Sequence, residues 1–227
     1  MKPKNTSPRY LAILSALYIT FLLLSSLIVY KLTTLAGYVI SASTLIFPIT
    51  YFLGDVITEV YGYKVSRQII WSAFLSIFVF DLLGPLMAHL PSPHYWPLQN
   101  SYNQVLNPLP RVFIGDFIAL NTGAFINAYL ISRWKILTRG RFFWARSIGA
   151  TAIGEFFFNI LAFGIMFTGK IPASVIFQAA LASYVLKILI AMFTAFPGSM
   201  LVFFLKKSEN KDVYDHAINF NPFKLTG

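Results

Sequence analysis

Long runs of uncharged, mostly apolar residues are the feature that most constrains the fold of this chain. Residues 11–30 and residues 32–54 contain no Asp, Glu, Lys or Arg. A block of about 18 or more such residues is long enough for a helix to cross a bilayer. Charged residues make up only 11% of the chain, against about 25% in soluble domains. The sequence therefore predicts an all-α membrane protein that crosses the bilayer several times, and excludes a soluble globular domain.

Six spanning helices are expected. They cover about residues 11–30, 35–59, 68–90, 112–132, 147–169 and 181–205. An interfacial piece at 171–180 is expected before the last of them, because the run 171–205 is longer than one span needs. A basic tail (1–10) precedes this six-helix domain (11–205), and a polar tail (206–227) follows it.

The placement of the basic residues predicts the orientation in the membrane. With six spans, both termini lie on the same side as the loops after the second and fourth spans. That side holds 14 of the 18 Lys and Arg residues, whereas the opposite side holds only Lys31, Arg111 and Lys170. Cytoplasmic loops carry an excess of Lys and Arg, so both termini are predicted to be cytoplasmic. The net charge of +10 then reflects topology and does not indicate a nucleic-acid partner.

Five of the eight acidic residues lie inside or at the ends of the predicted spans, together with one clearly intramembrane cation, Lys187. A charged group at the bilayer centre costs about 2.5–3.5 kcal/mol on insertion scales. Such groups must therefore be paired, be protonated, or face water or a solute. The five acids are Asp55, Glu59, Asp81, Asp116 and Glu155.

Several roles are open for these groups. Asp55 and Glu59 are four residues apart and share a helix face. They can pair with Lys64, Arg67 or other cations of the inner loops and so fix a turn, or they can contact a solute, and a gate would satisfy both interpretations. Lys187 can be a structural partner of Glu155 or Asp81 or a substrate contact.

Enzyme classes are not supported by the sequence. The chain has no Cys, no H-E-x-x-H, no G-x-S-x-G and no P-loop motif. Thiolate catalysis, disulfides and Cys-ligated metals are therefore excluded, and no cofactor or metal site is expected. Polar groups distributed over several helices of one bundle are typical of a solute pathway.

Four segments resemble the queuosine precursor transporter family, a vitamin-uptake-like group. The most specific are Phe47-Pro48 to Lys64, with Gly54-Asp55 and Thr58-Glu59-Val60-Tyr61-Gly62-Tyr63-Lys64, and Gly140-Arg141-Phe142-Phe143-Trp144-Ala145-Arg146 to Thr151, leading into Gly154-Glu155. The weaker ones are Phe125-Ile126-Asn127-Ala128-Tyr129, continuing to Lys135, and Ser183-Tyr184-Val185-Leu186-Lys187. These segments occur in the family order and at the family spacing.

The resemblance implies a fold and a function. It implies a six-helix bundle similar to the substrate-binding components of energy-coupling-factor transporters. It also implies uptake of deazaguanine precursors of queuosine, the cyano and aminomethyl forms, across a bacterial inner membrane for tRNA modification. One departure is that the family commonly has an acid followed by Ser or Thr where this chain has Phe158-Asn159. The run 156–158 of three Phe residues is itself interpreted as lipid contact or core.

The resemblance and the residues together give a site hypothesis. A carboxylate can accept the adjacent N–H and amino groups of a guanine-like edge, and Glu155 or Asp116 is expected to do so. Further substrate contacts are assigned to Asn127, Asn159, Tyr184 and Lys187, and an inner gate to Asp55, Glu59, Lys64 and Arg67.

The mode of transport is left open by the sequence. Buried carboxylates are compatible with proton coupling and equally with facilitated entry. The alternative function is that of a binding subunit for another small solute or vitamin, which works only with a partner energising module. The oligomeric state is also open, and a homo-oligomer is compatible with the sequence.

Overall fold

Six long helices form the body of the molecule. The computed structural model describes residues 8–216 and 218–224. Within this part of the chain, six helical segments are long and apolar enough to cross a membrane, which confirms the predicted six-helix bundle. The elements in order are α1 (Leu11–Ile28), β1 (Leu32–Leu35), β2 (Tyr38–Ser41), α2 (Ser43–Tyr61), α3 (Tyr63–Ala88), the short α4 (Gln99–Leu106), α5 (Leu109–Leu137), α6 (Phe143–Phe167) and α7 (Ala173–Glu209).

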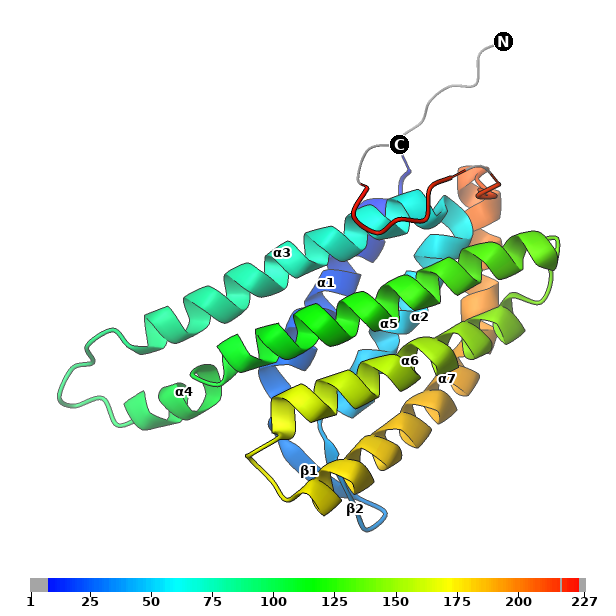
Figure 1. Ribbon diagram of the computed structural model, residues 1–227. Helices are drawn as coiled ribbons and strands as arrows, with labels where there is room; N and C mark the ends of the chain where they lie inside the picture. Colours follow the sequence, from blue (N-terminus) through cyan, green and yellow to red (C-terminus); the bar gives the residue numbers. More distant parts are fainter. Residues whose placement is uncertain (1–7, 217, 225–227) are drawn as a thin grey trace.

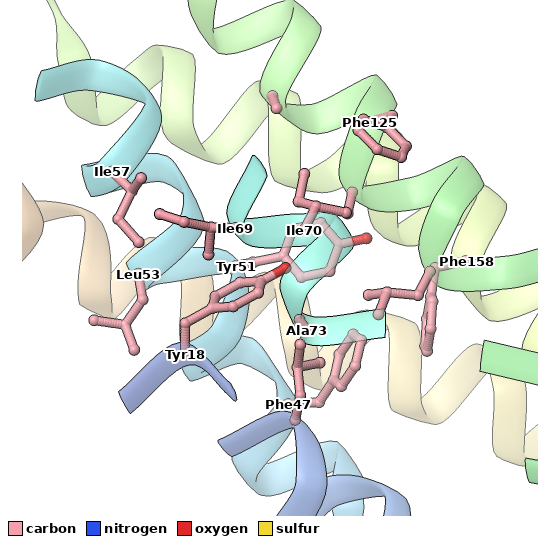
Figure 2. Packing of buried hydrophobic residues seen from close by; sticks show 14 of the residues in the cluster. Tyr18, Phe47, Tyr51, Leu53, Ile57, Ile69, Ile70, Ala73, Phe125 and Phe158 are labelled. Atoms are coloured by element: carbon pink, nitrogen blue, oxygen red, sulfur yellow. The ribbon is translucent and has the colours of Figure 1, made fainter. Parts of the chain in front are cut away.

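Helix α2 lies at the centre of the bundle (Figure 1). It packs against α1, α3, α5, α6 and α7, and 13 of its 19 residues are buried. A helix that is covered on every side carries few exposed polar residues, so the polar residues of α2 must find partners inside the protein. Figure 2 shows the apolar part of this core, in which the α2 side chains Phe47, Tyr51, Leu53 and Ile57 meet side chains from neighbouring helices: Tyr18, Ile69, Ile70, Ala73, Phe125 and Phe158.

Helices α5 and α6 pack at very short range. A Cβ atom placed on Gly123 would lie 2.8 Å from the Gly154 carbonyl oxygen, and the reverse distance is also 2.8 Å. The hydroxyl of Tyr51 would lie 2.5 Å from the Gly123 Cβ. Small residues let membrane helices approach closely, and these two glycines leave room for the Tyr51 ring between the helices.

A β-hairpin replaces the expected start of the second span. Strands β1 and β2 pair antiparallel, with Leu32 opposite Ser41 and Leu35 opposite Tyr38. The turn residues Ala36 and Gly37 both have positive φ, 50° and 83°, as a two-residue hairpin turn requires. The prediction that the helix begins near residue 35 was wrong. Five of the eight strand residues are β-branched or aromatic (Thr33, Thr34, Tyr38, Val39 and Ile40), and such residues favour strands over helices.

The last span is one continuous helix, which corrects the expected division of residues 171–205. Helix α7 runs for 37 residues from Ala173 to Glu209 after Pro172. At 1.5 Å per residue this is about 55 Å, longer than the roughly 30 Å hydrocarbon core. Its first turns pack against β2, so the hairpin supports the part of the helix that was expected to be a separate interfacial piece.

The start of the first span and the end of the last span lie on the same side of the bundle, as an even number of spans requires (Figure 1). The backbone N–H of Tyr10, just before α1, donates to Glu209 Oε1 at the end of α7 over 2.8 Å. The rings of Tyr10 and Phe204 are 5.6 Å apart. We call this side the terminal end of the bundle, and the side of the hairpin the hairpin end.

Candidate functional site

Two groups of buried charges lie at different depths in the bundle. The central cluster consists of Glu155, Asn159, Lys187 and the nearby Asp116. The inner cluster, at the terminal end, consists of Glu59, Lys135, Arg146, Lys206 and Asp212.

The central cluster is built around the ammonium of Lys187. Its Nζ donates to Glu155 Oε2 over 2.9 Å and to Asn159 Oδ1 over 3.2 Å. The amide nitrogen of Asn159 donates in turn to the Ala180 carbonyl over 2.9 Å. Glu155 and Asn159 are one turn apart on α6, so both face α7. Glu155 is completely buried, and its Oε1 has no hydrogen-bond partner among the described residues.

Two stacked aromatic rings lie beside this ammonium. The rings of Phe47 and Phe158 are 4.3 Å apart and 21° from parallel. Lys187 Nζ lies 4.5 Å from the centroid of each ring. A cation within about 6 Å of an aromatic ring centroid is attracted by the ring quadrupole. One carboxylate and two ring faces therefore stabilise the buried ammonium of Lys187 in the bundle interior.

A small cavity adjoins the central cluster on its hairpin side. Its volume is about 30 Å³, room for about one or two water molecules. Its walls come from α1, α2, α5, α6, α7 and the hairpin, and combine hydroxyl groups, aromatic rings and two charged residues: Ser25, Ser26, Ser41, Ser43, Thr44, Phe47, Asp116, Phe158, Phe163, Phe167 and Lys187.

Asp116 is the one acidic residue among the described residues that line this cavity. It is 8% exposed, and the described part of the chain offers it no hydrogen bond and no ion pair within 4 Å. The nearby Asp81 differs, because Ser26 Oγ donates to its carboxylate over 3.1 Å. The Ser25 hydroxyl, also on the cavity wall, is buried without a partner among these residues. Among the described residues, Asp116 is therefore the carboxylate on the cavity wall that has no protein partner.

Asp55 is held by neutral groups. Asn127 Nδ2, Ser147 Oγ and Thr151 Oγ1 all donate to its carboxylate. These donors come from α5 and α6, so Asp55 ties α2 to both helices. The Asn127 side-chain oxygen remains without a partner among the described residues.

The inner cluster surrounds the fully buried Glu59. Arg146 Nη1 donates to Glu59 Oε2 over 2.7 Å, and Lys206 Nζ to Oε1 over 2.6 Å. Lys135 Nζ donates to the Glu59 carbonyl over 2.6 Å and lies 3.8 Å from Oε1. One carboxylate thereby joins four helices, α2, α5, α6 and α7, at the terminal end.

Asp212 completes this cluster from outside the helices. Its Oδ1 lies 2.6 Å from Lys135 Nζ and 2.8 Å from Lys206 Nζ. Partial burial alone would raise the pKa of Asp212, but the hydrogen bonds from both lysines outweigh it and hold the pKa below its ordinary value.

The hairpin end is closed by a second set of contacts. The Arg111 guanidinium donates to the Ile165 carbonyl over 2.8 and 2.9 Å and to the Thr168 carbonyl. The Tyr30 hydroxyl donates to the Met166 carbonyl over 2.9 Å. These bonds fasten α5 and the segment after α1 to the end of α6, over the small cavity.

The sequence matches a family of transporters over most of its length. The family described as "Putative vitamin uptake transporter" matches residues 41–202. The chain belongs to this family. A relative from Bacillus subtilis (strain 168), named "Probable queuosine precursor transporter", is 25% identical over 171 residues, which cover 74% of each chain. No solved structure matches the chain. With its six membrane-crossing helices, this member of the vitamin uptake transporter family is a multi-pass bacterial membrane transporter and not an enzyme.

The structure divides the residues expected to bind substrate. Asp116 and Lys187 line the cavity. Glu155 and Asn159 are not among its lining residues but accept hydrogen bonds from Lys187. Asn127 instead belongs to the Asp55 group, closer to the terminal end. Tyr184 is half-buried, and its hydroxyl donates to the Ala152 carbonyl over 3.2 Å, away from the cavity. Of the three consecutive Phe residues, Phe156 and Phe157 are exposed on the outer surface and Phe158 is core.

Of the pairings left open for Asp55 and Glu59, those with Lys64 and Arg67 do not form. Lys64 is exposed, and neither cation is within ion-pair distance of Asp55 or Glu59 in the described chain. Arg67 is 2% exposed and donates to backbone carbonyls near the C-terminus. Glu59 instead pairs with Lys135 and Arg146, which are among the other cations that the sequence left open and which lie at the ends of α5 and α6, and with Lys206 of α7. The sequence could have identified Arg146 as a candidate partner, because Arg146 belongs to the specific family segment that ends at Thr151.

Proposed function

We propose that this transporter takes up deazaguanine precursors of queuosine, and that the cavity beside the central cluster is where they bind. Membership of the family and the name of the Bacillus relative support the substrate class. The observation that carries the proposal is Asp116, a buried carboxylate with no partner among the described residues, on a wall that also bears an ammonium and aromatic rings.

The chemistry of the wall suits a guanine-like ring. Such a ring presents an N–H and an amino group side by side, which the Asp116 carboxylate can accept as a bidentate pair. Its carbonyl oxygen can accept from Lys187. The flat ring system suits contact with Phe47 or Phe158, whose faces are already used for stacking. In this proposal Glu155 and Asn159 orient Lys187.

Contacts between helices are made at both ends of the bundle in the present arrangement. A cavity of about 30 Å³ is too small for a bicyclic ring, because it holds only about one or two waters. Binding therefore requires the contacts of Arg111 and Tyr30 at the hairpin end to separate. Release on the other side requires two sets of α2 contacts to separate: those of Glu59 with the inner cluster, and those of Asp55 with α5 and α6.

The proposal includes the orientation of the protein in the membrane and the kind of bundle it forms. The basic residues of the terminal end favour a cytoplasmic location for both termini. We also propose that the six-helix bundle is similar to the substrate-binding components of energy-coupling-factor transporters, as the family resemblance implies.

The experiment is uptake of labelled cyano-deazaguanine. The host is a bacterium that lacks queuosine synthesis and its own precursor transporter, expressing this chain alone, with queuosine in tRNA as the readout. Restored queuosine at low external precursor supports an autonomous transporter. Lack of restoration, with the protein present in the membrane, contradicts it and favours a binding subunit that needs an energising partner, or another solute. Uptake that collapses with a protonophore indicates proton coupling.

A further inference from the structure

The chain continues beyond α7 as an extended segment that folds back over the terminal end (Figure 1). Helix α7 ends at Glu209, and Asn210 turns the chain with φ 52°. We call residues 211–216 and 218–224 the C-terminal strap. It lies outside residues 41–202, which the family model matches.

The first anchor of the strap is Asp215, which is 5% exposed. Its Oδ2 accepts from the backbone N–H of Tyr63 over 2.9 Å and from Ser132 Oγ over 2.7 Å. Tyr63 is the first residue of α3, and the first N–H groups of a helix have no partner within the helix. A carboxylate at this position also interacts favourably with the helix dipole. The strap therefore caps α3 and ties it to α5.

The turn between α2 and α3 is shaped to fit the strap. Gly62 has φ 85°, and a Cβ on it would lie 2.8 Å from Val213 Cγ1 and 3.0 Å from Asp215 Oδ1. The backbone N–H of Val213 also donates to the Val60 carbonyl over 3.3 Å. A residue larger than glycine at position 62 would displace the strap.

The second anchor is one face of α3. Tyr63, Arg67 and Trp71 are spaced by four residues, so they lie along the same face, and each donates to strap carbonyls. The Tyr63 hydroxyl donates to Phe220 over 2.9 Å, and Trp71 Nε1 to Pro222 over 2.7 Å. Arg67 Nη1 donates to the Asn219 and Asn221 carbonyls over 3.0 and 2.8 Å. This explains why Arg67 is buried without an acidic partner.

The third anchor is the inner cluster itself. The strap supplies Asp212, which contacts both lysines that flank Glu59. Lys135 Nζ also donates to the Val213 carbonyl over 2.6 Å. Without the strap, three cations would share the single carboxylate of Glu59, and they would repel one another.

We propose that the C-terminal strap is the inner closure of the transport path. It fastens the α2–α3 turn, α5 and α7 together at the terminal end, and it must detach before these helices can separate and release substrate. This inference rests on the proposed function for its role in transport, but the closure itself does not depend on the substrate.

Closure can be measured by cysteine labelling, because the chain contains no Cys. Ser66→Cys places one thiol at the contact between α3 and α2, where the Ser66 and Thr58 hydroxyl oxygens are 2.6 Å apart and Ser66 is 3% exposed. It therefore reports whether the α2–α3 turn, which the strap fastens, has opened. Ser208→Cys, on an exposed position of α7, is the accessible reference. In the purified full-length protein, a water-soluble maleimide should label Ser66→Cys slowly and Ser208→Cys rapidly.

Loosening the strap should expose the reporter. Asp215→Asn or Trp71→Phe, each added to Ser66→Cys, should raise its labelling rate about tenfold, the effect expected from weakening a hydrogen bond to a charged or buried group. Labelling of Ser208→Cys should not change. Trp144→Phe is the matched control, since Trp144 is 53% exposed and outside the strap. Unchanged labelling in both strap variants would overturn the closure.

Detachment during transport is tested by locking the strap. Val60→Cys with Val213→Cys joins two residues whose backbones are hydrogen-bonded. In proteoliposomes, oxidation that consumes both thiols should stop cyano-deazaguanine uptake, and a reductant should restore it, while either single variant is insensitive to oxidant. Undiminished uptake by the locked protein would refute the gate. If the wild type takes up no cyano-deazaguanine, the proposed function has failed, and the labelling rates still decide whether the strap closes the bundle.

Discussion

Lys187 Nζ lies 2.9 Å from Glu155 Oε2, and this contact joins α7 to α6 in the middle of the bundle. Both groups are almost fully buried. Breaking a buried ion pair on one side leaves an uncompensated charge and costs about 3–5 kcal/mol. The pair can therefore serve stability, substrate orientation or both, and variants of its two members separate these roles.

Glu155→Gln is expected to abolish uptake of cyano-deazaguanine and also to lower the melting temperature, because Lys187 loses its carboxylate. The double variant Glu155→Gln with Lys187→Met should regain most of the stability, since no unpaired charge remains. Uptake should stay lost if the pair orients the substrate. Thermal unfolding in detergent and uptake in cells measure the two effects, and a double variant with normal uptake would assign the pair to structure alone.

Asp116→Asn, unlike Glu155→Gln, is expected not to lower the stability of the protein. Asp116 has no partner in the described chain, so the neutral side chain should leave the melting temperature unchanged or raise it. Affinity for cyano-deazaguanine should fall about 10- to 100-fold, because hydrogen bonds to a charged group contribute about 1.5–3 kcal/mol. Binding to the purified protein is the measurement. Thr122→Ala, on the same helix with its hydroxyl bonded to Ile118, is the control; equal affinity in both variants would exclude Asp116 as a substrate ligand.

The departure at Phe158 gives a third prediction. Lys187 Nζ is 4.5 Å from the Phe158 ring centroid, so a carboxylate at position 158 would approach the same ammonium. Phe158→Asp alone should destabilise the protein, because it removes the stack with Phe47 and about 3–5 kcal/mol of packing. Combined with Glu155→Gln, the loss should be smaller than the sum of the two single losses, by 0.5 kcal/mol or more as coupled residues generally show. Additive changes in unfolding free energy would mean that position 158 cannot replace Glu155.

The number and order of the spans could be predicted from the sequence, because the hydrophobic effect acts on whole segments and each long apolar run is visible by itself. The hairpin could not be separated from the second span in this way. Residues 32–41 are as uncharged as the first turns of the helix that follows them, and only their strand-favouring residues and the turn at Ala36 and Gly37 distinguish them.

The partners of the buried charges were harder to predict than their presence. The acids of α2 stood out because charge is rare in a span, but Glu59 is paired with residues 76, 87 and 147 positions away. Such contacts depend on how helices are arranged around α2, which no local pattern encodes. Lys64 and Arg67 are close in sequence to Glu59, yet the α2–α3 turn at Gly62 directs them elsewhere.

Glu59→Gln should be among the most destabilising single substitutions at the terminal end. Arg146, Lys135 and Lys206 would lose their shared carboxylate in a buried site, at about 3–5 kcal/mol. Lys206→Met should cost less, because its side chain is 20% exposed and the other two cations still balance Glu59. The melting temperatures of the two variants in detergent test this order. A Glu59→Gln protein as stable as wild type would show that the cluster does not hold the helices together.

Asp212 gives a prediction in which pH is the variable. Hydrogen bonds from Lys135 and Lys206 hold its pKa in the folded protein below the ordinary value of 3.8. A carboxyl group with a depressed folded pKa contributes stability above its unfolded pKa and loses it as the pH falls through the folded pKa. Asp212→Asn should therefore lower the melting temperature at pH 7, and the gap to wild type should narrow only below about pH 3.8. The side chain is 42% exposed, so solvent screening keeps the gap modest. Melting curves from pH 7 to pH 3 provide the test, and a gap that does not change with pH would mean that Asp212 acts through packing of the strap and not through its charge.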